Sequence, residues 1–314
     1  MILALGPMAG YTNAPFRKIC TDLGANLTIT EMVSAMGLLH APKSGEPYRH
    51  LLHINSNEKN VYAQLFGSDP LVCQQAANII ADMGIFHAID LNMGCPVKKI
   101  VGNGEGSALL KNPAQAARIV EAIAKSCPLP VTVKMRIGWD ASHINAVDFA
   151  KMLEQSGASL ITVHGRTREQ FYSGRANWDV IAQVKQAVQI PIIANGDVTD
   201  AASAQAILDA TACDGLMVGR ASMGNPWIFQ EIAARLAGQS YTPPDAAARR
   251  DLMMAHFQSL LSFAGEEKGL AEAKSQLVQY FYGRDKASLA RRSLNQASSA
   301  AEVIDLIERF FEAA

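Results

Sequence analysis

The chain has 314 residues and a formal net charge of −1, and 49% of its residues are hydrophobic against 18% that are charged. These values are typical of a globular protein with one large domain, or with a large and a small one, and they exclude a long disordered chain. The net charge gives no global sign of a nucleic-acid binder, although a local basic face would be enough to bind one.

The cysteines and the N-terminus indicate the cellular compartment of the protein and whether it binds metal. Five cysteines are widely spaced, an odd number, and no two of them form a Cys-x-x-Cys pair. This argues against a disulfide framework and a zinc site, so we expect no metal ion. Met1 to Pro7 lacks a basic leader, and no uncharged apolar run approaches the roughly 18 residues of a membrane span. We therefore expect a cytoplasmic protein without a membrane partner, and we expect a monomer.

Short apolar runs alternate with segments of helical spacing along the first two thirds of the chain. The predicted strands are Ile2 to Gly6, Leu27 to Thr30, Val61 to Phe66, Ala88 to Leu91, Val131 to Met135, Leu160 to Val163, Ile192 to Ala194 and Gly215 to Val218. The predicted helices include Pro70 to Met83, Pro113 to Ser126, Ala146 to Gln155, Trp178 to Ala187 and Ala201 to Leu208. Eight such units predict an α/β fold, a (β/α)8 TIM barrel. The alternative is an open doubly wound sheet, but no Gly-x-Gly-x-x-Gly follows the first strand.

The alternation ends at Pro243-Pro244, and the remaining chain has helical spacing throughout. Its predicted helices are Ala246 to Ala264, Leu270 to Tyr282, Ser288 to Ala297 and Ala300 to Phe311. We expect a barrel domain over residues 1–240 and a smaller all-helical domain over 245–314. The segment from Lys268 to Arg292 has six basic and two acidic residues, with three aromatic residues among them. Such a segment fits an RNA-contacting module, and it also fits an ordinary solvated helix face.

Most of the predicted strands carry a polar residue near the carboxyl end or are followed by one. They are Gln64, Asn92, Cys95, Lys134, Arg136, His164, Asn195, Asp197 and Arg220. The active site of a barrel lies at the carboxyl ends of its strands, where these side chains would meet. Lys134 and Arg136 are two residues apart and so share one face of a strand. Gly196, Gly219 and Arg220 are typical of the phosphate site that barrels build after strands seven and eight.

Cys95 has two interpretations. A free cysteine before a turn is most often a core residue. At a strand end beside polar groups it is a candidate for chemistry, and a thiol with an ordinary pKa near ~8.5 is protonated at neutral pH and can act as a general acid. A nucleophile would need a lower pKa, which Lys98 and Lys99 could provide if they pointed at it. We prefer the acid, because no base lies nearby in the sequence.

Seven motifs in this order resemble the tRNA-dihydrouridine synthases, in their bacterial, FMN-dependent form. They are Gly6 to Gly10 (Gly-Pro-Met-Ala-Gly), Gln64 to Gly67 (Gln-Leu-Phe-Gly), Asp90 to Pro96 (Asp-Leu-Asn-Met-Gly-Cys-Pro), Val133 to Arg136 (Val-Lys-Met-Arg), His164 to Thr167 (His-Gly-Arg-Thr), Ala194 to Asp197 (Ala-Asn-Gly-Asp) and Val218 to Arg220 (Val-Gly-Arg). The resemblance covers nearly the whole chain, including the helical domain. No single motif would be specific, but the Asn-Met-Gly-Cys-Pro and His-Gly-Arg-Thr elements together are.

The resemblance implies an activity. FMN would bind at the barrel mouth and be reduced by NADPH, and a hydride would pass from the flavin to C6 of specific uridines in the D-loop of tRNA. Cys95 would donate the proton to C5, which gives 5,6-dihydrouridine. The positive charge of Lys134 would stabilise the reduced flavin.

The resemblance also implies the binding residues. The implied cofactor residues are Pro7, Met8, Ala9, Gln64, Lys134, His164, Asn195, Gly196, Asp197, Gly219 and Arg220. Those expected at the tRNA are Asn92, Lys98, Lys99, Arg136, Arg166, Arg168, Tyr172, Arg175, Arg284, Lys286, Arg291 and Arg292. The target uridine would have to swing out of the folded tRNA to reach the flavin.

Two alternatives remain open from the sequence. An FMN barrel that acts on a small molecule, similar to dihydroorotate dehydrogenases, could share the flavin site and a loop cysteine. It would not explain the basic helical domain. A non-catalytic RNA-binding protein could keep a vestigial barrel, and such a protein would be colourless.

Overall fold

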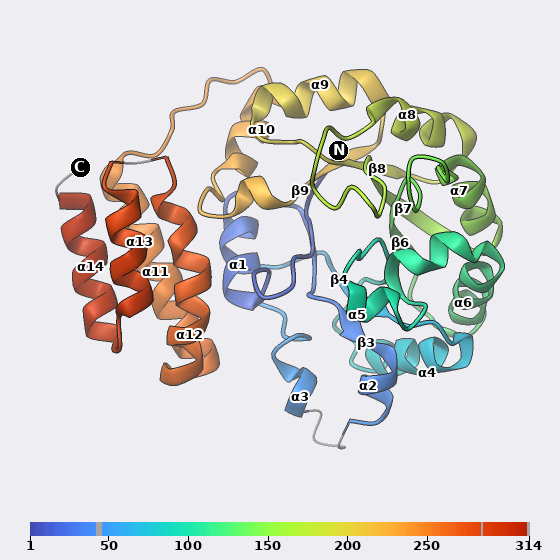
Figure 1. Cartoon of the computed structure of the whole chain (residues 1–314), viewed down its shortest axis with the longest axis horizontal. Helices are drawn as coiled ribbons and strands as arrows, with labels where there is room; N and C mark the ends of the chain where they lie inside the picture. The colour runs from blue at the N-terminus through green and yellow to red at the C-terminus, as the bar shows by residue number, and fades with distance from the viewer. Residues whose placement is uncertain (42–45, 284, 313–314) are drawn as a thin grey trace.

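Eight parallel strands form a closed barrel in the computed structural model, which describes residues 1–41, 46–283 and 285–312 (Figure 1). The strands are β1 Ile2–Leu5, β2 Leu27–Ile29, β4 Val61–Phe66, β5 Ala88–Met93, β6 Val131–Arg136, β7 Ala158–His164, β8 Ile192–Asn195 and β9 Gly215–Val218. β2 pairs with β1 on one side and with β4 on the other, which closes the ring. A two-residue strand, β3 Val33–Ser34, pairs with the end of β4. The predicted (β/α)8 barrel is confirmed.

Helices surround the barrel and connect its strands. They are α1 Ala14–Asp22, α2 Ala35–Leu39, α3 Glu46–Arg49, α4 Pro70–Ala81, α5 Lys98–Val101, α6 Pro113–Ser126, α7 Ala146–Gln155, α8 Trp178–Ala187, α9 Ala201–Thr211 and α10 Ile228–Leu236, with 3₁₀ turns η1 Gly106–Lys111 and η2 Arg220–Ser222. Asp69 and Asn112 each accept a hydrogen bond from the first turn of the helix that follows, and a proline occupies the first position of that helix. These residues fix where α4 and α6 begin.

Alternation along the strands separates the core from the site. Outward side chains pack under the helices, whereas inward side chains change from apolar at the foot of the barrel to polar at its mouth. The foot is filled by Ala4, Leu27, Ile29, Leu160, Ile193 and Met217. β7 shows the gradient along a single face, where Leu160 is followed by Thr162 and then His164. The barrel interior is therefore a packed floor beneath a polar mouth.

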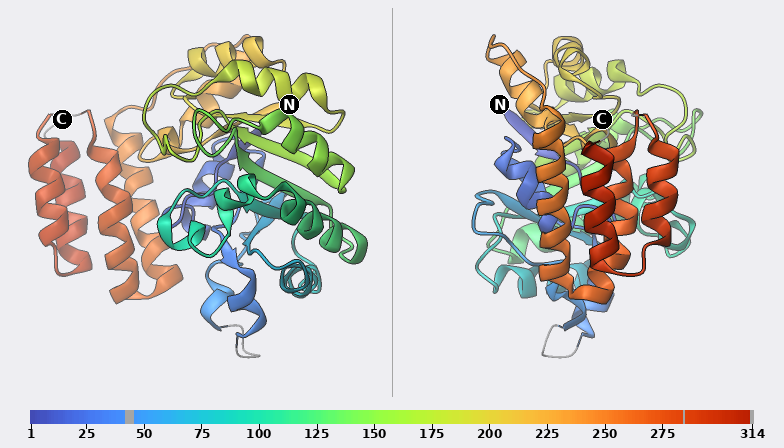
Figure 2. Two further views of the ribbon diagram at one scale, coloured as in Figure 1. Left: turned by 45° about the vertical axis from the view of Figure 1, so that its right-hand side comes forward. Right: turned by 90° about the vertical axis from the view of Figure 1, so that its left-hand side faces the viewer.

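The C-terminal helices pack against the flank of the barrel beside α1, as both views show (Figure 2). They are α11 Ala246–Ala264, α12 Glu266–Gln276, the 3₁₀ turn η3 Leu277–Phe281, α13 Ala287–Gln296 and α14 Ala300–Glu312. Phe257, Leu260 and Phe281 belong to a second hydrophobic core, separate from that of the barrel. The predicted all-helical region is confirmed.

The predicted helix over Leu270 to Tyr282 is wrong at both ends. α12 begins earlier, at Glu266, and ends at Gln276, after which the chain tightens into η3. The glycine at position 269 permits the early start, because a Cβ there would lie 2.7 Å from the carbonyl oxygen of Leu260 in α11. The tighter turn places Tyr280 and Phe281 in the second core.

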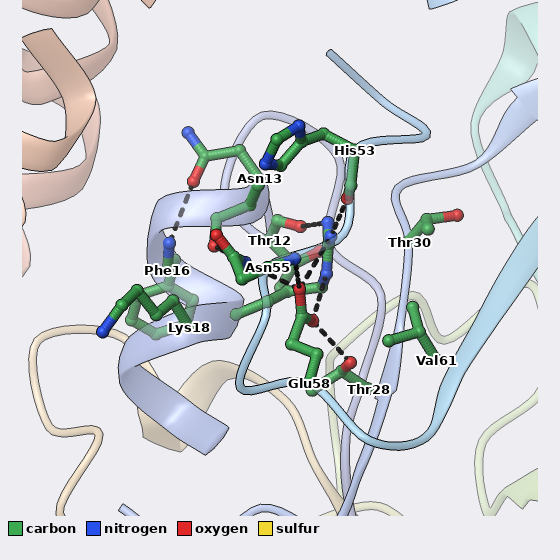
Figure 3. A network of polar contacts seen from close by, with 12 residues as sticks. Thr12, Asn13, Phe16, Lys18, Thr28, Thr30, His53, Asn55, Glu58 and Val61 are labelled. Atoms are coloured by element: carbon green, nitrogen blue, oxygen red, sulfur yellow. Dashed lines mark hydrogen bonds and ion pairs between the residues drawn. The ribbon is translucent and has the colours of Figure 1, made fainter. Parts of the chain in front are cut away.

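A buried ion pair fixes the start of α1. Arg17 Nε donates to Glu58 Oε1 at 2.9 Å, and both side chains are fully buried. Glu58 also accepts from Thr28 Oγ1 at 2.7 Å and from the backbone N–H of Asn55 at 2.9 Å (Figure 3). Arg17 further donates to the carbonyl of His53. Burial raises the pKa of the Glu58 carboxyl, but the Arg17 charge and these hydrogen bonds more than offset that effect and hold it below its ordinary value.

Membrane-spanning helices and metal-binding clusters are both absent within the described ranges. No helix there is long and apolar enough to cross a membrane. No group of three His, Cys, Asp or Glu side chains there is placed to hold a metal ion. All five cysteines are free thiols.

Candidate active site at the barrel mouth

A cavity of about 930 Å³ opens at the carboxyl ends of the strands. All the predicted cofactor residues line it, namely Pro7, Met8, Ala9, Gln64, Lys134, His164, Asn195, Gly196, Asp197, Gly219 and Arg220. So do Cys95 and four of the residues predicted at the tRNA, Asn92, Arg136, Arg166 and Tyr172. The structure thus brings motifs from seven strands together around one space.

The register of the strands explains this convergence. Asn92 of β5 lies beside Lys134 of β6, and Arg136 of β6 lies beside His164 of β7, which in turn lies beside Asn195 of β8. Neighbours in register point to the same side of the sheet, and the side chains of these residues line the cavity. Inward residues near the ends of β5 to β8 therefore form a polar layer at the mouth.

A buried carboxylate orients the amides of this layer. Asp90 is fully buried, and it accepts hydrogen bonds from Gln64 Nε2 and from Thr132 Oγ1, each at 2.7 Å. With its nitrogen fixed in this way, Gln64 presents Oε1 to Asn92 Nδ2 at 2.9 Å. Burial raises the pKa of Asp90, while the bonds from Gln64 and Thr132 oppose that effect. Asp90 was not among the predicted site residues, although a charged residue in a buried strand, two positions before Asn92, was a signal.

The backbone around Cys95 is held on both sides. Asn92 Oδ1 accepts from the N–H groups of Gly94 at 3.1 Å and Cys95 at 2.9 Å. Ser107 Oγ donates to the carbonyl of Cys95 at 2.8 Å. Cys95 is half-buried and lines the cavity, whereas the other four cysteines are buried. The hydrogen bonds from Asp90 through Gln64 and Asn92 therefore end at the backbone N–H of Cys95, the residue whose thiol faces the cavity.

Lys134 brings a destabilised positive charge to the mouth. Its Nζ donates to Asn195 Oδ1 at 3.2 Å, and Asn195 is oriented by its own bond from Nδ2 to the carbonyl of Met217 at 2.9 Å. Burial, with the neighbouring Arg136 charge, lowers the pKa of Lys134 to about 8. A lysine held in this way gains stability from an anionic partner.

Arg136 fixes the loops of the mouth. It donates to the carbonyls of Gly94 and Thr167, each at 2.8 Å, and to that of Phe171 at 2.9 Å. Burial lowers the pKa of Arg136 to about 10. The side chain predicted to contact tRNA thus already has three carbonyl partners within the protein, and it ties the Cys95 loop to the loop after β7.

Arg166 and Asp197 form an ion pair on the cavity wall. Arg166 is only 2% exposed, and its Nη2 lies 2.7 Å from Asp197 Oδ1. Its Nη1 is buried and has no hydrogen-bond partner in the described part of the chain. Burial and the nearby Lys134 charge hold the pKa of His164 far below its ordinary value, so this imidazole is neutral. An unpartnered guanidinium donor beside a neutral histidine suits an anionic ligand.

Tyr172 stands at the entrance of the cavity. It is 51% exposed, and the guanidinium of Arg220 lies 4.3 Å from the centre of its ring. Beside Arg220, a Cβ added at Gly219 would meet nothing nearer than Met8 Sδ at 4.0 Å. The cavity is therefore open at the position where a phosphate was predicted.

The C-terminal helices also reach the mouth. Ser275 lines the cavity, and Gln276 Nε2 donates to the carbonyl of Gly10 at 3.3 Å. Tyr11 Oη donates to the carbonyl of Gln276 at 3.2 Å and accepts from the N–H of Gly224 at the same distance. The loops after β1 and β9 thus meet at Tyr11, and the loop after β1 is bonded to Gln276 of α12. Tyr11, Ser275 and Gln276 were not predicted as site residues, since no local sequence pattern pairs segments so far apart.

A buried histidine supports Gln276 from within the helical region. His256 Nε2 lies 3.1 Å from Gln276 Oε1, and His256 Nδ1 lies 3.2 Å from Tyr280 Oη. Because the Gln276 amide donates through its nitrogen to Gly10, its oxygen accepts, so His256 carries its proton on Nε2. Burial lowers the pKa of His256 to about 4.

The other residues predicted at the tRNA lie outside the cavity. Lys98, Lys99, Arg175, Lys286 and Arg292 are exposed on the surface. Arg168 is half-buried, and the guanidinium of Arg291 lies 4.6 Å from the ring centre of Tyr282. Arg284 lies outside the described residues.

Comparison with known proteins places the chain. The family model for dihydrouridine synthase (Dus) matches residues 2–314. A probable tRNA-dihydrouridine synthase of Rhodobacter capsulatus is 41% identical over 308 residues, which cover 98% of this chain and 94% of the relative. The tRNA-dihydrouridine synthase B of Proteus vulgaris is 41% identical over 313 residues, which cover 99% of this chain and 95% of the relative.

Solved structures share the barrel at low sequence identity. A morphinone reductase mutant in complex with tetrahydroNAD has a TM-score of 0.53 at 14% identity, covering 79% of this chain and 90% of that one. A histamine dehydrogenase from Rhizobium has a TM-score of 0.58 at 12% identity, covering 82% of this chain and 48% of that one. These likenesses concern the fold, whereas the family match covers nearly every residue. The chain belongs to the dihydrouridine synthase family.

Proposed function

We propose that this enzyme reduces specific uridines in the D-loop of tRNA to 5,6-dihydrouridine, with FMN in the mouth cavity and NADPH as the reductant. The observation that carries the proposal is the lining of that cavity. Four cationic side chains, Lys134, Arg136, Arg166 and Arg220, line it against one carboxylate, Asp197, and the half-buried thiol of Cys95 faces the same space. The relatives named above are tRNA-dihydrouridine synthases.

The residues at the mouth fit a flavin phosphate. A site of several hundred cubic ångströms suits a ligand of this size. The surplus of positive charge, the free Nη1 of Arg166 and the open space at Gly219 suit the phosphate end. We assign Gln64, Lys134 and His164 to the ring system, with Pro7, Met8 and Ala9 along its edge, Asn195, Gly196 and Asp197 to the ribityl chain, and Gly219 and Arg220 to the phosphate. Bound FMN, once reduced, supplies the hydride for C6 of the uracil.

The protein's own groups have separate tasks in this proposal. Cys95 holds the proton for C5, and Asn92 fixes the backbone that aims the thiol. Lys134 favours negative charge on the ring system beside it, because burial and the nearby Arg136 charge destabilise its own positive charge. The hydrogen bonds from Asp90 keep Gln64 in one orientation, so it presents the same amide edge to every ligand.

The two regions of the chain divide the work. We assign the chemistry to residues 1–240 and contacts with the tRNA backbone to residues 245–314, with Lys98, Lys99 and Arg175 as further contacts on the barrel. Lys286, Arg291 and Arg292 supply the basic charge of the helical side. Such an enzyme acts in the cytoplasm, and a monomer suffices, because one chain provides every wall of the cavity that the structure describes.

The first test is made on the purified protein with NADPH and an unmodified tRNA transcript. We expect a yellow protein, bleaching by NADPH, and dihydrouridine detected by mass spectrometry of the digested tRNA. Cys95→Ala should keep the flavin and slow uridine reduction about 10²- to 10⁴-fold, the range expected when a general acid is removed. Cys213→Ala is the matched control, since this buried thiol precedes β9 at the foot of the barrel.

Three results would contradict the proposal. A colourless protein would favour a non-catalytic RNA binder. Reduction of a free pyrimidine at full rate, with no dihydrouridine in tRNA, would favour the small-molecule enzyme. Full uridine reduction by Cys95→Ala would remove the thiol from its role as the acid.

A further inference from the structure

Four residues form a cation–aromatic cluster at the rim of the mouth, made of Lys111, Trp139, Arg168 and Phe171. Lys111 Nζ and the guanidinium of Arg168 each lie 4.6 Å from the centre of the Trp139 ring. Arg168 also lies 5.7 Å from the centre of the Phe171 ring. The members come from three loops, since Lys111 ends η1, Trp139 follows β6, and Arg168 and Phe171 follow β7.

Backbone hydrogen bonds hold the loops after β6 and β7 together. The N–H of Arg168 donates to the carbonyl of Gly138, and the N–H of Glu169 donates to that of Trp139, each at 2.9 Å. Phe171 has a φ of 50°, a left-handed conformation that a bulky residue rarely adopts. The cluster is thus preformed, and strain of this kind is found where a side chain is held for a ligand.

The two cations keep their hydrogen-bond donors free. Arg168 Nε is buried and has no partner, and across residues 1–41, 46–283 and 285–312 no carboxylate pairs with either Lys111 or Arg168. Asp140, the carboxylate next to Trp139 in sequence, pairs with His143 at 2.7 Å. Both cations therefore lie on one aromatic ring with no anionic partner among the described residues. A phosphodiester that reaches this ring can accept their donors.

The cluster lies across the mouth from the C-terminal helices. Around the barrel, β5 and β6 lie opposite β9 and β1, and the loop after β1 contacts α12. The helical side carries a similar pair, because the guanidinium of Arg291 lies 4.6 Å from the ring centre of Tyr282, a residue that is 57% exposed. The barrel and the helical region therefore each carry a cation–aromatic pair that an RNA strand could contact.

We propose that the cation–aromatic cluster is a second RNA subsite, which binds the phosphodiester backbone next to the reacting uridine. Lys111 and Arg168 take the phosphate, and Phe171, which is 39% exposed and lines the cavity, stacks on the neighbouring base. The proposal rests on the proposed function, because it needs a tRNA with its uridine in the cavity. NADPH is the other source of phosphate that would reach this rim, and the experiment separates the two.

The test uses the flavin-loaded full chain and an unmodified tRNA transcript, with binding followed by fluorescence anisotropy over a range of salt concentrations. In Lys111→Gln/Arg168→Gln the Kd for tRNA should rise about tenfold or more. The slope of log Kd against log salt should fall by about 0.7 for each phosphate that the variant no longer neutralises. Arg118→Gln/Lys125→Gln removes the same charges from exposed positions on α6 and should bind tRNA as the parent protein does.

The other possible results either support the proposal or overturn it. Lys111→Gln alone, at an exposed position, should raise the Kd about threefold if the double variant does not fold. A Kd and a salt slope equal to those of the α6 control would overturn the proposal. So would a raised Michaelis constant for NADPH without tRNA, combined with unchanged tRNA binding. A parent protein that binds tRNA but forms no dihydrouridine would overturn the proposed function and leave the binding test of the cluster intact.

Discussion

Two groups of buried charge in this protein solve the same physical problem in opposite ways. The Arg17–Glu58 pair beside α1 closes on itself, since the guanidinium has a carboxylate partner and Glu58 accepts additional hydrogen bonds. At the mouth, the cations outnumber the carboxylate, the pKa of Lys134 falls to about 8, and Arg166 Nη1 has no partner among the described residues. A closed group stabilises the fold, whereas an open one is stabilised by a ligand.

The largest expected effect comes from opening the closed group. Arg17→Met would leave the Glu58 carboxylate buried without its cation, and the free energy of unfolding should fall by about 3–5 kcal/mol. Chemical denaturation measures this decrease. The double variant Arg17→Met/Glu58→Leu is the control and should recover much of it. A decrease below about 1 kcal/mol in the single variant would show that the pair is not the anchor of α1.

The second prediction concerns the pH dependence of stability and the buried His256, which bonds to Gln276 and Tyr280. Its pKa is about 4 in the folded chain against an ordinary 6.5, so between these values the unfolded chain binds more protons and stability falls as pH falls. The decrease from pH 6.5 to pH 4 is about 3 kcal/mol, at 1.36 kcal/mol for each pKa unit. Denaturation curves of the parent and of His256→Phe, compared across this range, measure it. Parallel pH profiles would contradict the lowered pKa of His256. The pKa of His164 is also lowered, but its contribution is the same in both proteins and cancels in the comparison.

The third prediction tests the open group and has the opposite sign for stability. Lys134→Met removes a charge that burial already disfavours, so the cofactor-free protein should unfold at the same or a higher denaturant concentration. Reduction of bound flavin by NADPH should slow about 100-fold, which corresponds to about 2.7 kcal/mol. Stopped-flow absorbance measures the rate. A decrease in stability as large as that in Arg17→Met would mean that Lys134 stabilises the fold in the same way as the Arg17–Glu58 pair does.

Much of the barrel could be predicted because its signals are local. A short apolar run marked each strand, and the rule that barrel sites lie at carboxyl ends then pointed to Gln64, Lys134 and Asn195, which the structure brings to one cavity. The role of Asp90 could not be predicted in the same way, because its two partners come from other strands.

Contacts between distant segments leave no pattern in the sequence from which they could be predicted. Gln276 bonds to Gly10 across 266 positions, and only the folded chain shows that α12 closes the mouth. The early start of α12 likewise depends on the close approach of Gly269 to Leu260 of α11. This contact is a matter of tertiary packing, which the helix propensity of the segment does not show. The roles of the surface arginines depend on a partner, so neither spacing nor burial assigns them.

The contact between Gln276 and the first loop has a consequence for how the protein matures. Gly10 and Tyr11 leave the ribosome early, but the residue that fixes them belongs to a helix made near the end of synthesis. A nascent chain can therefore close its barrel at β9 while two walls of the cavity still lack their support. We expect the cofactor to be taken up late, after α12 has folded against the mouth.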